Sequence, residues 1–108
     1  MAFVKVGDAG TLAPGTSRKY EYNGTAMLVA NVDGTLCAIA SDCPHAKGDL
    51  SAGKIADGIV TCPQHGSQFD LRTGRNVRGA KILFLKIPVR DARAFAVKVE
   101  GADLLVEI

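Results

Sequence analysis

Two short segments, CPHAKGDL and CPQHGSQFDLRTG, contain both histidines of the chain and two of its three cysteines. In the first segment Cys43 precedes His45 by two positions, and in the second Cys62 precedes His65 by three. Sixteen residues separate His45 from Cys62. Four potential metal ligands grouped in this way are hard to credit to chance. The sequence therefore predicts a fold that brings two loops face to face around one inorganic centre.

Length and composition place the chain among small globular proteins. Its 108 residues predict a single domain, 1–108. The formal charge of +2 is small and the basic residues look scattered, so we expect neither a nucleic acid nor a membrane surface as a partner. The N-terminus has no apolar stretch of signal-peptide length, and no apolar run approaches the length of a membrane span. We expect a cytoplasmic location, where thiolate ligands are favoured over a disulfide.

Turn signals divide most of the chain into short strands. Asn23-Gly24 and Asp33-Gly34 predict two hairpin turns, and so a three-stranded meander over residues 17–40. Asp57-Gly58 predicts a further hairpin. The segment CPHAKGDL, called the first box, precedes this hairpin, and the segment CPQHGSQFDLRTG, called the second box, follows it. No stretch has helical periodicity longer than two turns. The predicted class is all-β, small and antiparallel.

Both ends of the chain are also predicted to be strands. AFVKV at the N-terminus reads as an edge strand, and KILFLKI, FAVKV and LLVEI read as strands towards the C-terminus. The third cysteine, Cys37, lies in the last strand of the meander and is interpreted as a buried hydrophobic residue outside the site.

Two thiolates and two imidazoles suit two kinds of centre. Zinc binds such ligands tetrahedrally, and a 2Fe-2S cluster can bind two sulfur ligands on one iron and two nitrogen ligands on the other. A Cys2His2 zinc site usually pairs cysteine with cysteine and histidine with histidine. In this chain each box supplies one of each, which favours the cluster.

The pattern C-x-H followed by C-x-x-H-G-x-x-F-D and T-G resembles the Rieske 2Fe-2S signature. The resemblance implies a small antiparallel β fold with a cluster-binding tip subdomain at about residues 42–75. It also implies that Cys43 and Cys62 bind the inner iron, and that His45 and His65 bind the outer iron.

Residues beside the ligands are expected to support the cluster. Gly48 and Gly66 let the backbone bend closely around a compact core, although ordinary turn geometry is the alternative. Respiratory Rieske proteins carry an additional cysteine in each box, where this chain has Gly48 and Gln64. Ser67 matches a hydroxyl that such proteins direct at a sulfide, with turn capping as the alternative. Phe69 replaces a tyrosine and is expected to pack beneath the loop.

The resemblance implies a Rieske ferredoxin that carries single electrons from a flavin-containing ferredoxin reductase to a terminal, aromatic-ring-hydroxylating oxygenase. No histidine is left for a mononuclear iron site, so we expect an electron-transfer protein that is not an enzyme, and a monomer. Two alternatives stay open: a small Rieske subunit of a larger reductase such as nitrite reductase, and a zinc-stabilised binding module.

The section after Gly79 is longer than the resemblance implies. The stretch KILFLKIPVRDARAF could form an additional hairpin or a partner-recognition element, and we expect ILFL to be buried in the core.

Overall fold

The structure is a computed structural model that describes residues 2–42, 49–64, 66–82, 85–87 and 90–108. For residues 80–82 and 85–87 it describes the backbone. Its strands pair antiparallel throughout, and two single-turn 3-10 helices lie at Ala9–Thr11 and Leu50–Ala52. The predicted all-β antiparallel class is confirmed. No helix of the described residues is long and apolar enough to cross a membrane.

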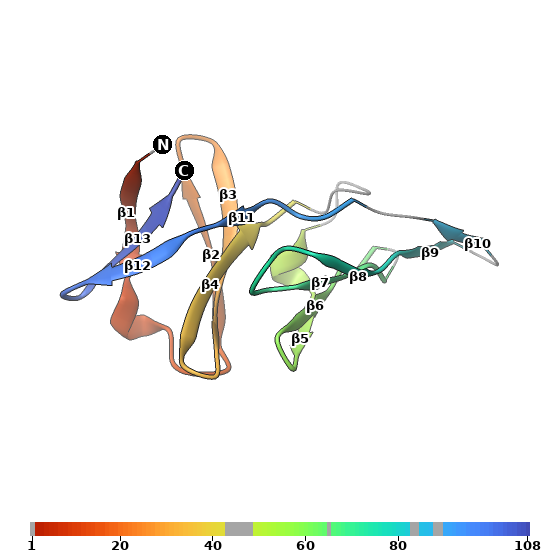
Figure 1. Ribbon diagram of the computed structural model, residues 1–108, viewed down its shortest axis with the longest axis horizontal. Coiled ribbons are helices and arrows are strands. Elements are labelled where there is room, and N and C mark those ends of the chain that lie inside the picture. Colours follow the sequence, from red (N-terminus) through yellow and green to blue (C-terminus); the bar gives the residue numbers. More distant parts are fainter. Residues whose placement is uncertain (1, 43–48, 65, 83–84, 88–89) are drawn as a thin grey trace.

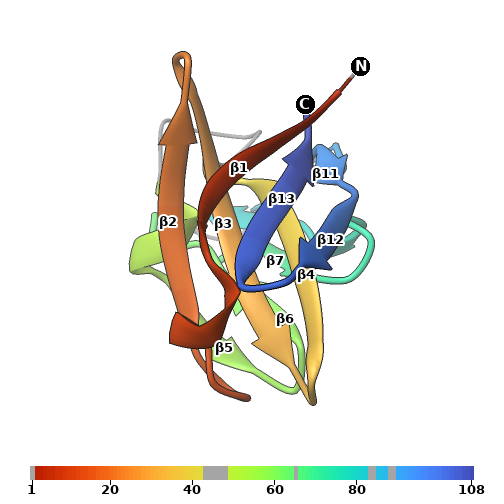
Figure 2. The same ribbon diagram turned by 90° about the vertical axis from the view of Figure 1, so that its left-hand side faces the viewer.

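Two sheets form one half of the molecule, which we call the base (Figure 1, Figure 2). The first sheet contains three strands in the order β1 (Phe3–Asp8), β13 (Asp103–Glu107) and β12 (Val97–Glu100). The second contains four strands in the order β11 (Ala94–Phe95), β4 (Thr35–Ala40), β3 (Thr25–Val32) and β2 (Ser17–Tyr22). The predictions of an N-terminal edge strand and of a strand at LLVEI are confirmed. The prediction of one strand over FAVKV is wrong, because the chain leaves the second sheet after Phe95 of β11 and joins the first sheet at Val97 of β12.

The meander predicted for residues 17–40 is also confirmed, and its turns follow the expected chemistry. Asn23 and Gly24 have φ of 48° and 82°, and Asp33 and Gly34 have φ of 53° and 91°. Two consecutive residues with positive φ match the right-handed twist of the paired strands, which is why Asn-Gly and Asp-Gly are favoured there.

Strand β3 is buried on both faces, so its sheet is the middle layer of the molecule. On one face Met27 and Val29 share a core cluster with Leu104 of β13. On the other face Leu28 shares a second cluster with Phe69. Side chains alternate between faces along a strand, and a strand covered on both sides therefore reads as the continuous apolar run AMLVANV.

A small four-stranded sheet forms the other half, which we call the tip (Figure 1). Its strands are, in order, β5 (Lys54–Ala56), β6 (Ile59–Thr61), β7 (Gln68–Asp70) and β8 (Asn76–Arg78). Asp57 and Gly58 join β5 to β6 with φ of 53° and 74°, which confirms the predicted hairpin. Strands β7 and β8 were not predicted, because three residues show no clear alternation and no Asn-Gly or Asp-Gly pair marks the turn between them.

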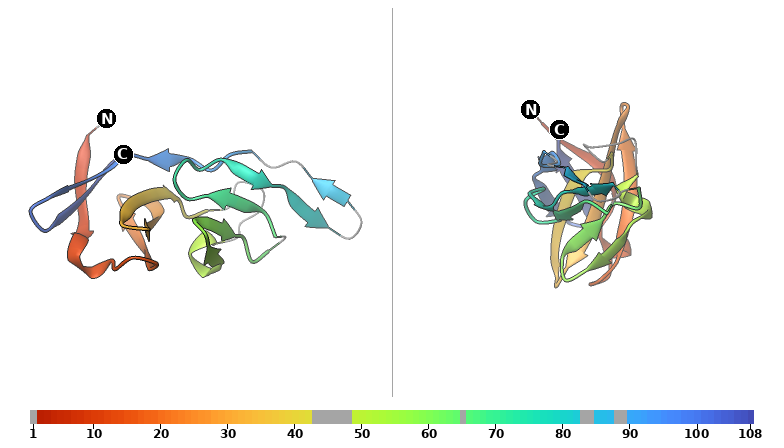
Figure 3. Two further views of the ribbon diagram at one scale, coloured as in Figure 1. Left: turned by 60° about the horizontal axis from the view of Figure 1, so that its bottom comes forward. Right: turned by 90° about the vertical axis from the view of Figure 1, so that its right-hand side faces the viewer.

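A separate hairpin, β9 (Ala80–Ile82) and β10 (Leu85–Ile87), follows the tip sheet. The prediction of one strand over KILFLKI is therefore wrong, and the alternative of an additional hairpin is confirmed. Among the described residues these strands pair only with each other. Figure 1 and Figure 3 show the hairpin projecting at the end of the molecule farthest from the chain termini. Leu83 and Phe84, part of the ILFL stretch expected in the core, lie outside the described residues.

Candidate metal centre

Cys62 stands where β6 ends and the second box begins, and only 2% of its surface is exposed. Its backbone N–H donates to the carbonyl oxygen of Ser67 over 2.7 Å, and the N–H of Gly66 donates to the carbonyl oxygen of Cys62 over 3.1 Å. Gly66 has φ of 77°, which a residue with a side chain adopts only at a cost. No atom of the residues that the structure describes lies within 4 Å of where its Cβ would be. The positive φ is therefore the reason for glycine at this position of the loop.

Ser67 closes the same loop, and its side chain is an unusual buried polar group. The residue is fully buried, and its hydroxyl has no hydrogen-bond partner within the described part of the chain. Leaving a buried hydroxyl unpaired costs roughly 1–3 kcal/mol. Among the described residues this hydroxyl forms no bond that would cap its own turn. A partner for this hydroxyl is expected in the centre that the loop encloses.

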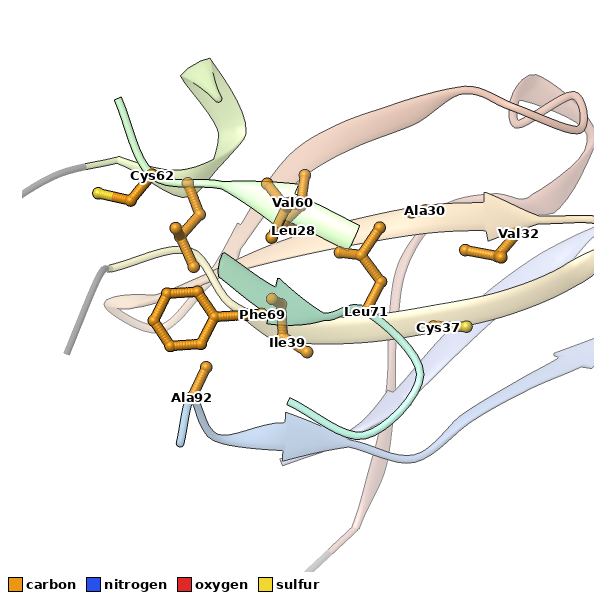
Figure 4. Close-up of a cluster of buried hydrophobic side chains, with 11 residues drawn as sticks. Leu28, Ala30, Val32, Cys37, Ile39, Val60, Cys62, Phe69, Leu71 and Ala92 are labelled. Atoms are coloured by element: carbon orange, nitrogen blue, oxygen red, sulfur yellow. The ribbon is translucent and has the colours of Figure 1, made fainter. Parts of the chain in front are cut away.

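The floor beneath the loop is apolar (Figure 4). Phe69 is fully buried and shares a core cluster with Cys62, so the prediction that it packs beneath the loop is confirmed. Cys37 belongs to the same cluster but lies at its opposite end, with Val60 and Leu71 in between (Figure 4). It is 7% exposed, and burial raises the pKa of its thiol. The interpretation of Cys37 as a buried residue away from the site is confirmed.

The remaining predicted site residues lie outside the described residues, and they are Cys43, His45, Gly48 and His65. The structure does describe both ends of the first box. Asp42 forms a β-bridge with Asp49, and the N–H of Leu50 donates to the carbonyl oxygen of Ser41 over 2.7 Å. The chain that enters the first box is thus bonded directly to the chain that leaves it.

Asp49 is the centre of a polar cluster that sequence reasoning missed. Its Oδ1 accepts from the hydroxyl of Ser41 at 2.7 Å, and from the hydroxyl and backbone N–H of Ser51 at 2.6 and 2.9 Å. Its Oδ2 accepts from Lys19 Nζ of β2 at 3.0 Å. The carboxylate of Asp49 therefore links both ends of the first box to strand β2 of the base.

Protonation of Asp49 is correspondingly disfavoured. The hydrogen bond from the Ser51 hydroxyl, with those from Ser41 and Lys19, outweighs the opposing effect of burial and holds the pKa of Asp49 well below its usual range. The same contact with Asp49 raises the pKa of Lys19. The sequence did carry one signal, because Asp49 precedes Leu50 and Ser51 as the N-cap of a 3-10 helix.

A pocket of about 400 Å³ opens beside Cys62. Its lining includes Pro63 and Gly66 of the second box and Gly53 and Lys54 from the start of β5. Gly53 is held against the β6 strand so closely that a Cβ would meet the carbonyl oxygen of Thr61. The pocket therefore has one wall from each of the two segments that flank the predicted hairpin.

The described residues fit a 2Fe-2S cluster. Thiolates such as that of Cys62 are the usual ligands of iron-sulfur clusters. A hydroxyl such as that of Ser67 can donate to a cluster sulfur, which gives the orphaned group a partner. A zinc-bound thiolate could accept the same hydrogen bond, so these described residues fit zinc as well as the cluster.

Comparison with known proteins gives a consistent result. The family model described as Rieske [2Fe-2S] domain matches residues 2–82. The chain is 39% identical to the ferredoxin component of biphenyl 2,3-dioxygenase from Rhodococcus jostii (strain RHA1), over 100% of this chain and 94% of that protein. It is 30% identical to a cytochrome b6-f complex iron-sulfur subunit from Chlorobaculum tepidum, but spans only 52% of that subunit.

Solved structures agree at the level of the fold. The ferredoxin of carbazole 1,9a-dioxygenase from Nocardioides aromaticivorans IC177 superimposes with a TM-score of 0.81 at 28% identity, covering 98% of this chain and 97% of that one. A ferredoxin solved in complex with the oxygenase of carbazole 1,9a-dioxygenase superimposes with a TM-score of 0.77 at 27% identity, covering 96% of this chain and 91% of the matched chain.

Proposed function

The chain belongs to the Rieske [2Fe-2S] domain family, and from this premise we propose that it is a one-electron carrier of a ring-hydroxylating oxygenase system. It would receive electrons from a flavin-containing ferredoxin reductase and pass them to a terminal oxygenase that acts on an aromatic compound. The observation that carries the proposal is the end-to-end match to a dioxygenase ferredoxin component. The match to a cytochrome b6-f subunit covers about half of that larger protein.

The proposed ligands are Cys43 and Cys62 on one iron, and His45 and His65 on the other. Support comes from the buried position of Cys62 at the base of a closed loop and from the spacing of the two boxes. A cluster of this kind, when bound, takes up and releases one electron. The chain's own contribution is to keep each of the two loops closed. Asp49 does this for the first box through its bonds to residues at both ends of that box.

Three neighbouring residues are proposed to support the cluster. Ser67 would donate a hydrogen bond to a cluster sulfur, which favours the reduced state and raises the potential. Gly66 contributes through its turn, where its N–H is already bonded to Cys62. Gly48 is proposed to give the first box similar freedom. Phe69 cannot donate the second hydroxyl bond of respiratory proteins, so we expect a potential in the lower half of the range of roughly −150 to +300 mV.

The protein is proposed to have no catalytic centre of its own. Oxygen activation at a mononuclear iron needs two histidines and a carboxylate. The chain has two histidines in all, and both are proposed cluster ligands. We further propose a cytoplasmic monomer without nucleic-acid or membrane partners, built as one Rieske domain, 1–108, with the cluster-binding subdomain at about 42–75.

The first test is the visible and low-temperature EPR spectrum of the anaerobically purified protein, before and after dithionite, with iron, zinc and acid-labile sulfide assayed together. We expect two irons and two sulfides per chain, and a rhombic EPR signal that appears on reduction. A colourless protein loaded with zinc would instead support the zinc-stabilised binding module.

The second test separates a free carrier from a subunit. Reduced protein is mixed with the terminal oxygenase, and its reoxidation is followed by stopped-flow absorption. Electron transfer by a free monomer supports the carrier. Purification only as part of a larger reductase, such as a nitrite reductase, would contradict it.

A further inference from the structure

Basic residues gather in one part of the chain, which we call the basic arm and define as residues 72–93. The arm holds seven of the thirteen lysines and arginines, and they are Arg72, Arg75, Arg78, Lys81, Lys86, Arg90 and Arg93. Asp91 is its single acidic residue, so its formal charge is +6. Six basic and ten acidic residues give the rest of the chain −4. The net charge of +2 hides this asymmetry, and the prediction of scattered basic residues is wrong here.

The arm runs away from the tip sheet, reverses direction in a hairpin and comes back beside its own first part. It runs through β8, passes through the projecting hairpin β9–β10, and comes back towards β11 (Figure 1, Figure 3). The N–H of Ala92 donates to the carbonyl oxygen of Gly74 over 2.7 Å, and the N–H of Asn76 donates to Asp91 Oδ1 over 2.8 Å. The outgoing and returning segments therefore lie side by side at these residues, so Arg75 and Arg90 stand next to a bonded pair of segments.

Most arginines of the arm are not used by the fold. Arg75, Arg78 and Arg90 are exposed and form no ion pair with any residue that the structure describes. Arg72 lies 3.7 Å from the highly exposed Asp33, a weak contact. Elsewhere, lysines on the base do find carboxylates, and the pairs are Lys5 with Asp103, Lys19 with Asp49 and Lys98 with Glu100. The exposed charges of Arg75, Arg78 and Arg90 are therefore available to a partner.

The arm is continuous with the candidate metal centre. Strand β8 pairs with β7, and Arg78 stands opposite Gln68, the residue after Ser67. The side-chain amide of Asn76 donates to the carbonyl oxygen of Gln68 over 3.0 Å, which ties the arm to the strand that leaves the second box. A protein that binds the arm is therefore brought next to the loop of Cys62.

We propose that the basic arm is a docking surface for an acidic surface of the terminal oxygenase, an inference that rests on the proposed function. Opposite charges speed the diffusional encounter of redox partners and orient a small, transient contact. A similar ferredoxin is known in complex with its oxygenase, which favours the oxygenase as the occupant over the reductase. Because the arm adjoins the candidate metal centre, an oxygenase bound to the arm lies close to that centre, and the electron then has a short distance to cross.

The test compares two charge reversals. The double variant Arg78→Glu/Arg90→Glu changes exposed residues of the arm, and Arg18→Glu makes the same kind of change at an exposed position of β2 in the base. Stopped-flow absorption gives the second-order rate constant for oxidation of each reduced protein by the biphenyl 2,3-dioxygenase oxygenase of Rhodococcus jostii RHA1. At low salt we expect the double variant to be slower by about tenfold or more, with a flatter salt dependence.

The control Arg18→Glu is expected to stay within about twofold of the unmodified protein, since distant exposed charges are screened. Iron content and reduction potential should be unchanged in both variants, which excludes damage to the centre. Equal rate constants for the two variants would overturn the inference. The inference would also be overturned if the double variant were reduced more slowly by the reductase but transferred electrons to the oxygenase at the unmodified rate. Binding to duplex DNA or anionic vesicles at about 0.15 M salt that the double variant loses would overturn it as well. An intact unmodified protein that reduces no oxygenase would contradict the proposed function itself, whereas transfer that the arm variant does not slow would overturn only this inference.

Discussion

The base and the tip are held together in different ways. The base has long strands, with up to eight residues in β3, that pack around their own cluster of buried side chains. The four strands of the tip sheet have three residues each, and the loops beside them are closed by backbone hydrogen bonds and by the carboxylate of Asp49. Short strands bury little apolar surface. The comparison teaches that the base has an apolar core of its own, whereas the tip depends on the core that it shares with the base, on polar contacts and on its proposed cluster.

The two halves are not independent, because one core cluster spans them. Leu28 and Ile39 of the base sheet pack with Val60 and Phe69 of the tip. Variants of the tip can therefore be ranked by what they remove. They remove the proposed 2Fe-2S cluster, the apolar core shared with the base, the hydrogen bonds of Asp49 that close the first box (the polar clamp), or a single hydrogen bond.

The largest effect is expected for Cys62→Ser. Removing a proposed thiolate ligand should abolish nearly all bound iron and the visible absorption, because the loop loses one of two sulfur donors. The far-UV circular dichroism of the base should persist. Iron and acid-labile sulfide per chain provide the measurement.

The matched control is Cys37→Ala, which changes the cysteine at the opposite end of the same core cluster. It should keep its iron and lose a little stability through the small cavity. Full iron content in Cys62→Ser would show that this thiolate is not a ligand.

The next largest effect is expected for Phe69→Ala. Phe69 is fully buried in the core that joins tip and base, so its truncation should lower the free energy of unfolding by about 3–5 kcal/mol. Chemical denaturation followed by circular dichroism measures the change. Val99→Ala at a half-exposed position of β12 should change stability by less than about 0.5 kcal/mol. A similar cost for both variants would mean that the shared core contributes no more than the surface.

A smaller effect is expected for Asp49→Asn, which weakens the clamp on the first box. Loss of charge-assisted bonds at an N-cap should cost about 1–2 kcal/mol near neutral pH and speed iron release to a chelator. The folded-state pKa of Asp49 is lowered, so its contribution is complete above the unfolded pKa of about 3.9 and is lost as pH falls towards the folded value. The difference between the two proteins should therefore shrink below about pH 4.

Lys19→Met provides the comparison for that variant, because it removes only the partly exposed ion pair to Asp49. Its cost should be smaller than that of Asp49→Asn, because solvent screens an exposed ion pair. A stability difference between Asp49→Asn and the unmodified protein that does not change from pH 7 to about pH 3 would show that the carboxylate charge is unimportant.

The smallest effect on stability is expected for Ser67→Ala, and its main consequence should be electronic. Without the buried hydroxyl the reduction potential should fall, because a hydrogen bond to a cluster sulfur favours the reduced state. Voltammetry measures the shift, and Ser17→Ala on the exposed face of β2 is the control. An unchanged potential with full iron content would place the hydroxyl's partner elsewhere.

Local chemistry made much of this fold predictable. The meander and the β5–β6 hairpin follow from Asn-Gly and Asp-Gly pairs whose residues have positive φ in the structure. The position of Phe69 beneath the loop and the burial of Cys37 were also predicted from residue type. The strand prediction failed for KILFLKI, because an unbroken apolar run contains no signal for where a chain reverses.

The sequence by itself indicated the protein family, since the residue types and spacings of the two boxes resemble the Rieske signature without reference to distant contacts. Tertiary structure alone decided how the loops are supported. Asp49 became a clamp only when folding brought Lys19 of β2 to it, thirty residues away in the chain. Ser67 became an orphaned donor only when packing excluded water from its hydroxyl. Both properties arise from long-range contacts and desolvation, which depend on which segments the fold places together.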